Sequence, residues 1–152
     1  MQIDEVDQRI IASLVADARS SYAEIGSRVS LSAPAVKRRV DRLRAAGVIR
    51  GFTTVIDPAA VGWNTEAFVE LFCTGRTTPT QITLATRRHP EVVAAYTVSG
   101  EADALVHLRA ADISHLEQAL ERLRAEPFVT SSRSMIVLSR LVDSPTVVPA
   151  PS

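Results

Sequence analysis

The stretch from residue 20 to residue 46 constrains the fold most, because it combines two helical patterns with a short polar turn. Ser21 and Glu24 have the spacing of a capping box, which predicts the start of one helix. Ser32 can cap the next helix, and Pro34 is tolerated in its first turn because the amides there have no helical partners. Two short helices joined by a tight turn are typical of a helix-turn-helix unit.

Positive charge is concentrated in and around the second of these helices. Residues 28–50 hold seven basic residues and one acidic residue, a net charge of +6 in a chain whose formal net charge is zero. The rest of the chain must therefore carry a charge of −6. Segregation of this kind predicts a nucleic-acid-binding part beside a part with another role. The basic residues are Arg28, Lys37, Arg38, Arg39, Arg42, Arg44 and Arg50.

The composition narrows the class of protein. A chain of 152 residues with 46% hydrophobic content suits one ordinary globular domain or two small ones. No apolar run approaches the roughly 18 residues that span a bilayer, and the N-terminus lacks the pattern of a secretory signal. Cys73 is the only cysteine, so neither an intrachain disulfide nor a cysteine metal cluster is expected. We expect a cytoplasmic, nucleoid-associated protein with no membrane partner, cofactor or metal.

Three helices are expected before residue 47. Asp4 can cap the first helix, and Asp7 in its first turn suits the positive end of the helix dipole. Apolar residues repeat at helical spacing in the first and third helices, and Gly47 ends the third. Residues 1–46 are therefore predicted to form a winged-helix-like, three-helix helix-turn-helix domain. The apolar stripes comprise Val6, Ile10, Ile11 and Leu14, and then Ala33, Val36, Val40 and Leu43.

The pattern changes after residue 46. Residues 47–64 are expected to form an extended linker, and residues 143–152, which are rich in proline, a mobile tail. Between them, residues 65–142 follow the order β-α-β-β-α-β, which is typical of a ferredoxin-like domain and makes the whole protein α+β. The predicted strands are 67–73, 92–98, 103–109 and 128–140, and the predicted helices are 78–89 and 112–125.

The predicted strands are largely apolar on both faces, as residues 92–98 and 134–138 illustrate. Two helices can cover only one face of a four-stranded sheet, so the other face needs a second cover. A second subunit is the simplest one. We therefore predict a homodimer, with residues 48–56 and the last strand contributing to the joint. The alternative cover is the helix-turn-helix part of the same chain.

The apolar stripe of the third helix fixes its outward face. At about 100° per residue, with Val36, Val40 and Leu43 facing inward, the outward face centres on Arg38. Helices of this kind contact base edges in the major groove with their N-terminal residues, and small side chains there allow close approach. The residues predicted to contact bases are Ser32, Pro34, Ala35 and Arg38, and those predicted to contact phosphates are Lys37, Arg39 and Arg42.

Two alternatives to these roles stay open. Arg39 and Arg42 could support the fold instead of contacting DNA. The whole helix could also be a solvated basic helix without a nucleic-acid partner. The capped helix before it, the length of the turn and the predicted dimer favour DNA binding.

Five segments resemble, in order, motifs of the Lrp/AsnC, or feast/famine, transcriptional regulators. They are 3–11 (IDEVDQRII), 31–43 (LSAPAVKRRVDRL), 47–52 (GVIRGF), 98–103 (VSGEAD) and 132–134 (SRS). The second resembles the recognition helix L-S-x-x-x-V-x-x-R-V-x-R-L, and Arg39 and Arg42 match its two arginines. The fourth is similar to a V-x-G-D-x-D loop. The resemblance covers residues 3 to about 142.

The resemblance implies a regulator of transcription that binds double-stranded DNA and dimerises through ferredoxin-like domains, and that can form tetramers or octamers. It also implies a small-molecule effector, an amino acid, bound near residues 98–103. Glu101 and Asp103 are then candidate partners for an α-ammonium group, although aspartate is commoner than Glu101 there and many members have an aromatic residue in place of Ala104. The implied effector-binding residues are Val98, Gly100, Glu101, Asp103, Ser132 and Ser134.

Two other functions are weighed against this one. An architectural DNA-binding protein without a ligand would share the basic helix, but the near-neutral total charge argues against it. An enzyme on a dimeric ferredoxin-like sheet is the second, because that fold hosts many activities. Against an enzyme, no histidine–carboxylate or nucleophile–base set has suggestive spacing. At the level of single residues, Glu101 and Asp103 could also belong to a solvated hairpin turn.

Overall fold

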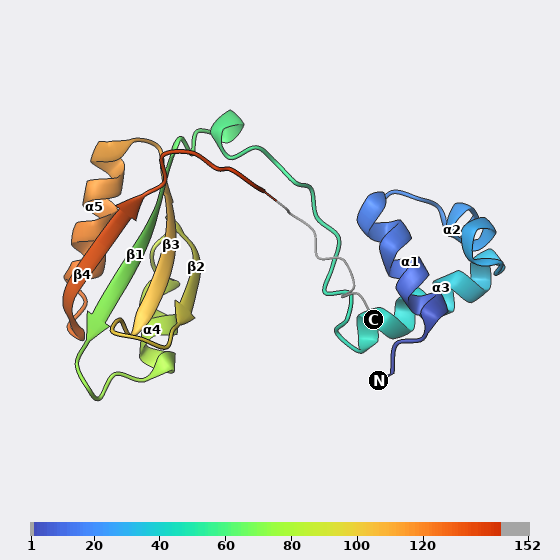
Figure 1. Cartoon of the computed structure of the whole chain (residues 1–152), viewed down its shortest axis with the longest axis horizontal. Helices are drawn as coiled ribbons and strands as arrows, with labels where there is room; N and C mark the ends of the chain where they lie inside the picture. Colours follow the sequence, from blue (N-terminus) through green and yellow to red (C-terminus); the bar gives the residue numbers. More distant parts are fainter. Residues whose placement is uncertain (1, 144–152) are drawn as a thin grey trace. The chain divides into compact units, whose positions relative to one another are not determined.

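The structure, a computed structural model, describes residues 2–143. These residues fall into two compact units, one comprising residues 2–55 together with 142–143 and the other spanning Ile56–Leu141 (Figure 1). Of the predicted tail, residues 144–152 lie outside the described residues. Within the described part, every helix is too short or too polar to cross a lipid bilayer.

Three helices make up the first unit, and a side chain caps the free amides at the start of each. They are α1 (Glu5–Ala16), α2 (Tyr22–Val29) and α3 (Ala33–Ala45). The predicted caps Asp4, Ser21 and Ser32 are confirmed, and the first two form complete capping boxes. Gly47 follows the end of α3 with a φ of 73°, a left-handed conformation that glycine adopts without strain.

The turn between α2 and α3 depends on close contact with Gly26. The Leu31 amide donates to the Gly26 carbonyl at 3.0 Å, and Ser30 takes the left-handed conformation with φ 58°. A Cβ atom on residue 26 would lie 2.3 Å from the Leu31 carbonyl oxygen. The chain can therefore turn this tightly only if residue 26 has no side chain.

The core of the first unit draws apolar residues from all three helices. The stripes predicted for α1 and α3 supply most of it, and the core residues are Ile10, Leu14, Ile25, Val29, Val36 and Val40. One polar residue lies on the same face of α1 as Ile10 and Leu14. It is Asp7, whose side chain is fully buried.

Residues 48–56, expected to be extended, have no helix or strand in the structure. They nevertheless expose apolar side chains, among them Phe52, Val55 and Ile56. The part up to Val55 lines a hollow of about 730 Å³ against α1, with Ile11 and Leu14 on its other wall.

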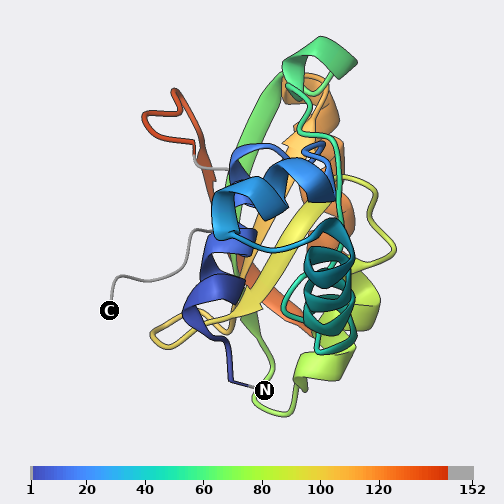
Figure 2. The same ribbon diagram turned by 90° about the vertical axis from the view of Figure 1, so that its right-hand side faces the viewer.

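The second unit is a four-stranded antiparallel sheet with two helices on one face (Figures 1 and 2). The strand order is β2-β3-β1-β4, as expected for the ferredoxin-like fold. A short 3₁₀ helix, η1 (Ala59–Val61), precedes the sheet. The other elements are β1 (Thr65–Cys73), α4 (Pro79–Thr86), β2 (Val92–Thr97), β3 (Ala104–Ala110), α5 (Ile113–Arg124) and β4 (Val129–Ile136).

Two of these elements are shorter than the sequence predicts. The helix predicted at 78–89 ends at Thr86, and Pro90 disfavours helical geometry at the residue before it. The strand predicted at 128–140 ends at Ile136, which pairs with Ala67 near the start of β1. Because β1 starts at Thr65, the last strand has almost no partner left beyond that point.

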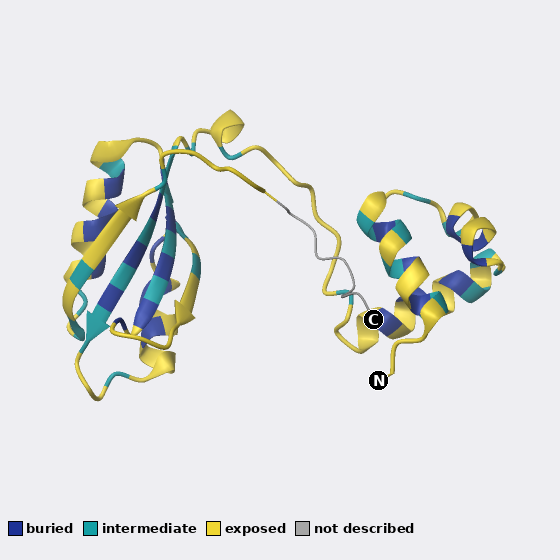
Figure 3. Cartoon of the chain, in the orientation of Figure 1, coloured by how far each residue is buried: buried dark blue, intermediate teal, exposed yellow. Residues whose placement is uncertain are grey.

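Burial alternates along the two central strands, as Figure 3 shows by alternating bands on β1 and β3. One side chain in two packs against α4 and α5 and forms the core of this unit. Its fully buried members include Ala67, Val69, Leu71, Ala104, Val106 and Leu108. The side chains between them lie on the opposite, open face.

The open face is less apolar than the sequence analysis predicted. Its apolar residues include Phe68, Tyr96 and Met135, the last two about half exposed at 55% and 48%. Charged groups lie between them and are paired within the chain. Glu70 bonds Arg133 at 3.2 Å, and Glu66 accepts bonds from Arg140 at 2.6 Å and contacts His107. Burial alone would raise the pKa of Glu66, but the bonds from Arg140 and His107 lower it overall.

We predict that Gly26→Ala destabilises the first unit by about 1–3 kcal/mol, because the added methyl group collides with backbone that cannot move without opening the turn. Thermal and urea unfolding followed by circular dichroism would measure the loss. Gly75→Ala is the matched control, since a Cβ there meets nothing within 4 Å. Equal stability of the two variants would contradict the role given to Gly26.

Candidate nucleic-acid interface and effector loop

The outward face of α3 presents Arg38. Its side chain is exposed, and within residues 2–143 it forms no hydrogen bond or ion pair. Val36, Val40 and Leu43 are fully buried on the opposite face, as the helical spacing predicts. Arg38 therefore carries an unpaired charge at an exposed position opposite the buried stripe of this helix.

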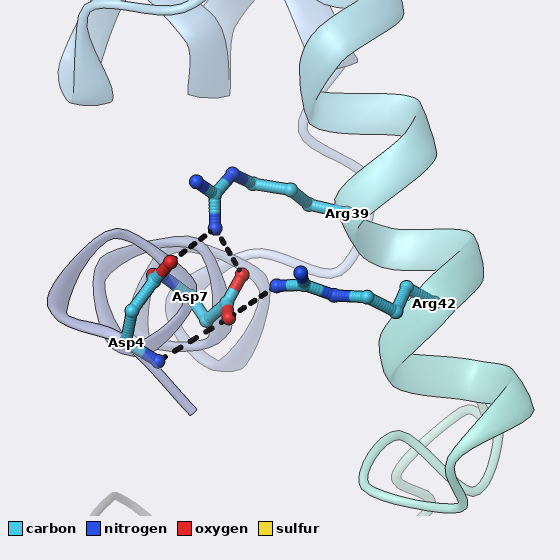
Figure 4. A network of polar contacts seen from close by, with 4 residues as sticks. All are labelled: Asp4, Asp7, Arg39 and Arg42. Atoms are coloured by element: carbon cyan, nitrogen blue, oxygen red, sulfur yellow. Dashed lines mark hydrogen bonds and ion pairs between the residues drawn. The ribbon is translucent and has the colours of Figure 1, made fainter. Parts of the chain in front are cut away.

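Arg39 and Arg42 are bound to α1 instead (Figure 4). Nη1 of Arg39 donates to Asp4 at 2.7 Å and to Asp7 at 2.8 Å, and Nη2 of Arg42 donates to the other oxygen of Asp7 at 2.6 Å. The Asp4 amide also donates to Asp7, at 3.3 Å. Both oxygens of the buried carboxylate are therefore satisfied, as a buried charge requires.

The two carboxylates differ in exposure. The Asp7 side chain is 0% exposed, whereas that of Asp4 is 50% exposed. The bond from Arg39 and the Asp7 amide lower the pKa of Asp4 below its usual value. Asp4 thus stays ionised at neutral pH, with one oxygen on the helix amide and the other on Arg39.

The remaining predicted DNA-binding residues lie along the same helix. Ser32 caps α3 by accepting a bond from the Ala35 amide at 3.4 Å, and Pro34 is exposed in the first turn. Lys37 donates to Asp41 at 2.6 Å, an exposed pair of the kind that contributes little to stability. The structure thus places the seven predicted residues on α3 or at its N-cap. Those that have no charged partner among the described residues lie at the N-cap or in the first two turns, and are Ser32, Pro34, Ala35 and Arg38. The three cations already paired with carboxylates are Lys37, Arg39 and Arg42.

The predicted effector residues 98–103 form the loop between β2 and β3. Gly100 has a φ of 132°, a conformation that favours glycine, and nothing lies within 4 Å of the position of a Cβ. Val98 and Glu101 are exposed. Within the described residues, Glu101 makes no hydrogen bond or ion pair, so its carboxylate is available to a ligand.

Asp103 has a structural task in the same loop. Its carboxylate accepts a bond from the Cys73 amide at 2.6 Å, and its own amide donates to the Leu71 carbonyl at 3.0 Å. Both groups belong to the end of β1. Asp103 therefore attaches the loop of residues 98–103 to a central strand, and its carboxylate is already engaged there.

Ser132 and Ser134 lie on β4, separated from the loop by β1. Leu71 of β1 pairs with both Ser132 and Ala104, so Ser132 is roughly 10 Å from the start of β3. Its hydroxyl accepts a bond from Nε of Arg124 at 2.8 Å. Ser134 pairs further along β1, with Val69. Within one chain, these serines are therefore too far from the loop of residues 98–103 to line the same pocket.

Each of the three histidines contacts a glutamate. His89 lies 3.3 Å from Glu126, His115 lies 2.8 Å from Glu91, and His107 contacts Glu66. Within the described residues, no group of three His, Cys, Asp or Glu side chains has the geometry of a metal site.

The sequence analysis did not identify the roles of two residues in the first unit, Asp7 and Gly26. Asp7 was interpreted only as a first-turn residue, although its spacing of three and seven from Ile10 and Leu14 places it on the buried stripe. Gly26 was not singled out, although a glycine inside a helical pattern often marks close backbone approach.

Comparison with known proteins matches each of the two units to a known domain. Residues 3–44 match the AsnC-type helix-turn-helix domain, and residues 66–147 match the Lrp/AsnC ligand binding domain. The chain is 56% identical over 142 residues to the HTH-type transcriptional regulator Rv2324 of Mycobacterium tuberculosis, covering 93% of this chain and 96% of that protein. It is 34% identical over 137 residues to the HTH-type transcriptional regulator LrpA of the same organism, covering 90% and 91%.

A solved structure has the same fold over nearly the whole chain. It is the feast or famine regulatory protein (Rv3291c) of M. tuberculosis complexed with L-methionine, with a TM-score of 0.89 and 32% identity, covering 97% of this chain and all of that one. The matched proteins are named as transcriptional regulators, which decides against the enzyme alternative. The chain therefore belongs to the Lrp/AsnC family of helix-turn-helix transcriptional regulators.

Proposed function

We propose that this regulator binds a near-palindromic DNA site as a homodimer, with α3 in the major groove and base contacts from Ser32, Pro34, Ala35 and Arg38. The observation that carries the proposal is the free guanidinium of Arg38 at the centre of the outward face of α3. A guanidinium reads guanine by donating to its O6 and N7 atoms. The place of action is then the nucleoid, within the cytoplasm.

Arg38→Ala tests the base contact. Binding sites are first selected from random DNA with the wild-type protein, and affinities are then measured at about 150 mM salt. We expect the variant to lose about 1–3 kcal/mol of preference for the selected site over random DNA, because one bidentate contact is removed.

Arg44→Ala is the control, because it removes the same charge from an exposed position away from the outward face. It should weaken binding to both DNAs equally. Equal affinity of the wild-type protein for selected and random DNA would support an architectural protein instead.

We also propose that an amino acid binds at the loop of residues 98–103, with Glu101 as the partner of its ammonium group. A structural relative of 32% identity is described as complexed with L-methionine. In this chain the Glu101 carboxylate is free of partners within residues 2–143, whereas Asp103 is bound to β1. Ser132 and Ser134 are too far from the loop of their own chain, so in this proposal they line the site from another subunit.

A thermal-shift screen of the twenty amino acids tests the effector. A specific ligand at about 100 times its Kd stabilises the protein by roughly 2.7 kcal/mol. Glu101→Gln should abolish the shift while leaving the unliganded protein as stable as before. Glu117→Gln, which removes an exposed glutamate from α5, should keep it. The amino-acid proposal fails if none of the twenty produces a shift in the wild-type protein.

The open face of the sheet is the proposed dimer joint, with residues 47–64 as the linker and residues 48–56 at its edge. Tyr96 and Met135 expose apolar surface there, and the charged groups among them already have partners. A face of this kind can be buried without leaving a charge unpaired. Tetramers or octamers would then assemble from dimers through other surfaces.

Met135→Arg should convert the dimer to a monomer, because it places an unpaired charge within the proposed joint. Sedimentation velocity measures the change. Leu84→Arg is the control, since Leu84 is 59% exposed on α4, which covers the other face of the sheet. A variant at residue 135 that remains dimeric would place the joint elsewhere.

A further inference from the structure

A hollow of about 320 Å³ lies on the surface of α3, and three arginines line it. Arg42 is a neighbour of both Arg38 and Arg39 on the helix surface, because it lies four and three positions after them. The other lining residues, Leu31 and Ala35, are small or apolar. The carboxylates Asp4 and Asp7 are not part of the lining, so the charged groups that face the hollow are all positive.

Arg39 and Arg42 each use only one terminal nitrogen to bond a carboxylate. Asp4 and Asp7 accept bonds from Nη1 of Arg39, and Asp7 accepts one from Nη2 of Arg42. Within residues 2–143, the other terminal nitrogen of each has no partner. Figure 4 shows both side chains extending from α3 to the buried carboxylate. A guanidinium is a rigid planar fork, so fixing one end also fixes the direction of the other.

This arrangement suits an oxyanion such as a phosphate group. The side chains of Arg39 and Arg42 are 27% and 49% exposed, so a ligand can reach them from solvent. The anchored forks lose less side-chain entropy on binding than free arginines would. The charge-assisted hydrogen bonds that guanidinium groups make to phosphate oxygens are short and strong.

We propose that this hollow is the seat of one phosphate of the DNA backbone, which Arg39 and Arg42 bind, and that Asp7 is the positioning residue that directs these two arginines toward it. The proposal rests on the DNA binding of α3, but not on sequence preference, because phosphate contacts are independent of sequence. Asp7 does not touch the DNA. It acts through the two arginines.

Asp7→Asn separates positioning from simple charge. The variant makes the protein more positive by one charge, so general electrostatics predicts tighter binding to DNA. The proposal predicts the opposite: weaker binding and a shallower salt dependence, because Arg39 and Arg42 lose their common anchor. Affinity for a random-sequence duplex, measured by fluorescence anisotropy from about 50 to about 200 mM NaCl, decides between them.

Two further variants calibrate this experiment. Arg42→Ala should reduce the slope of log affinity against log salt by about one unit, the value for one lost phosphate contact. Asp4→Asn should not weaken binding, because asparagine still caps α1 and Asp7 still holds both arginines. Circular dichroism and thermal melting establish that each variant is folded. Tighter binding by folded Asp7→Asn with an unchanged slope would overturn the positioning role.

A DNA-side test holds even if Asp7→Asn fails to fold. Neutral methylphosphonates are placed singly along a duplex that carries the selected site, and binding of the wild-type protein and Arg42→Ala is compared. Replacing the phosphate seated in the hollow should weaken DNA binding by the wild-type protein, and should weaken binding by Arg42→Ala less, because that variant has already lost one of its contacts to this phosphate. If replacement lowers the DNA affinity of both proteins by the same amount at every position, the hollow does not bind a phosphate. If no preferred site can be selected, sequence specificity fails, while the salt slopes on random DNA still decide the phosphate contact.

Discussion

The geometry of the DNA-binding unit depends on one buried carboxylate. Removing a carboxylate such as Asp7 from water costs several kcal/mol, and the cost is offset only when charged partners and hydrogen bonds satisfy both oxygens. Arg39, Arg42 and the Asp4 amide supply these bonds. The bonds from two arginines of α3 to one carboxylate of α1 are directional, so they restrict how the two helices rotate against each other. α3 is therefore held by a polar contact as well as by its apolar stripe.

The two faces of the sheet in the second unit differ in composition. The face under α4 and α5 is apolar and fully packed, and it provides the core. The open face combines apolar side chains with charge pairs such as Glu70–Arg133. Charges that are already paired in the monomer lower the cost of covering this face in a dimer. The same pairs interrupt the apolar surface of this face.

The local elements were predictable because their signals are local. Asp4, Ser21 and Ser32 indicate helix starts through the spacing of capping residues, and the short, largely apolar runs at 67–73 and 103–109 indicate strands. What the sequence did not reveal depends on pairs far apart in the chain. The bonds of Asp7 join residues more than thirty positions apart, and the anchoring of Asp103 to Cys73 spans thirty. Strand ends also depend on their partner, since β4 stops where β1 begins, not where its own apolar run stops.

The attachment of the loop at residues 98–103 has a mechanical consequence. Asp103 is joined twice to the end of β1, once through its carboxylate and once through its amide. β1 is a central strand, hydrogen-bonded to β3 on one side and β4 on the other. The same strand carries Phe68 and Glu70 on the open face. β1 therefore connects the loop of residues 98–103 to the open face directly, without a flexible segment between them.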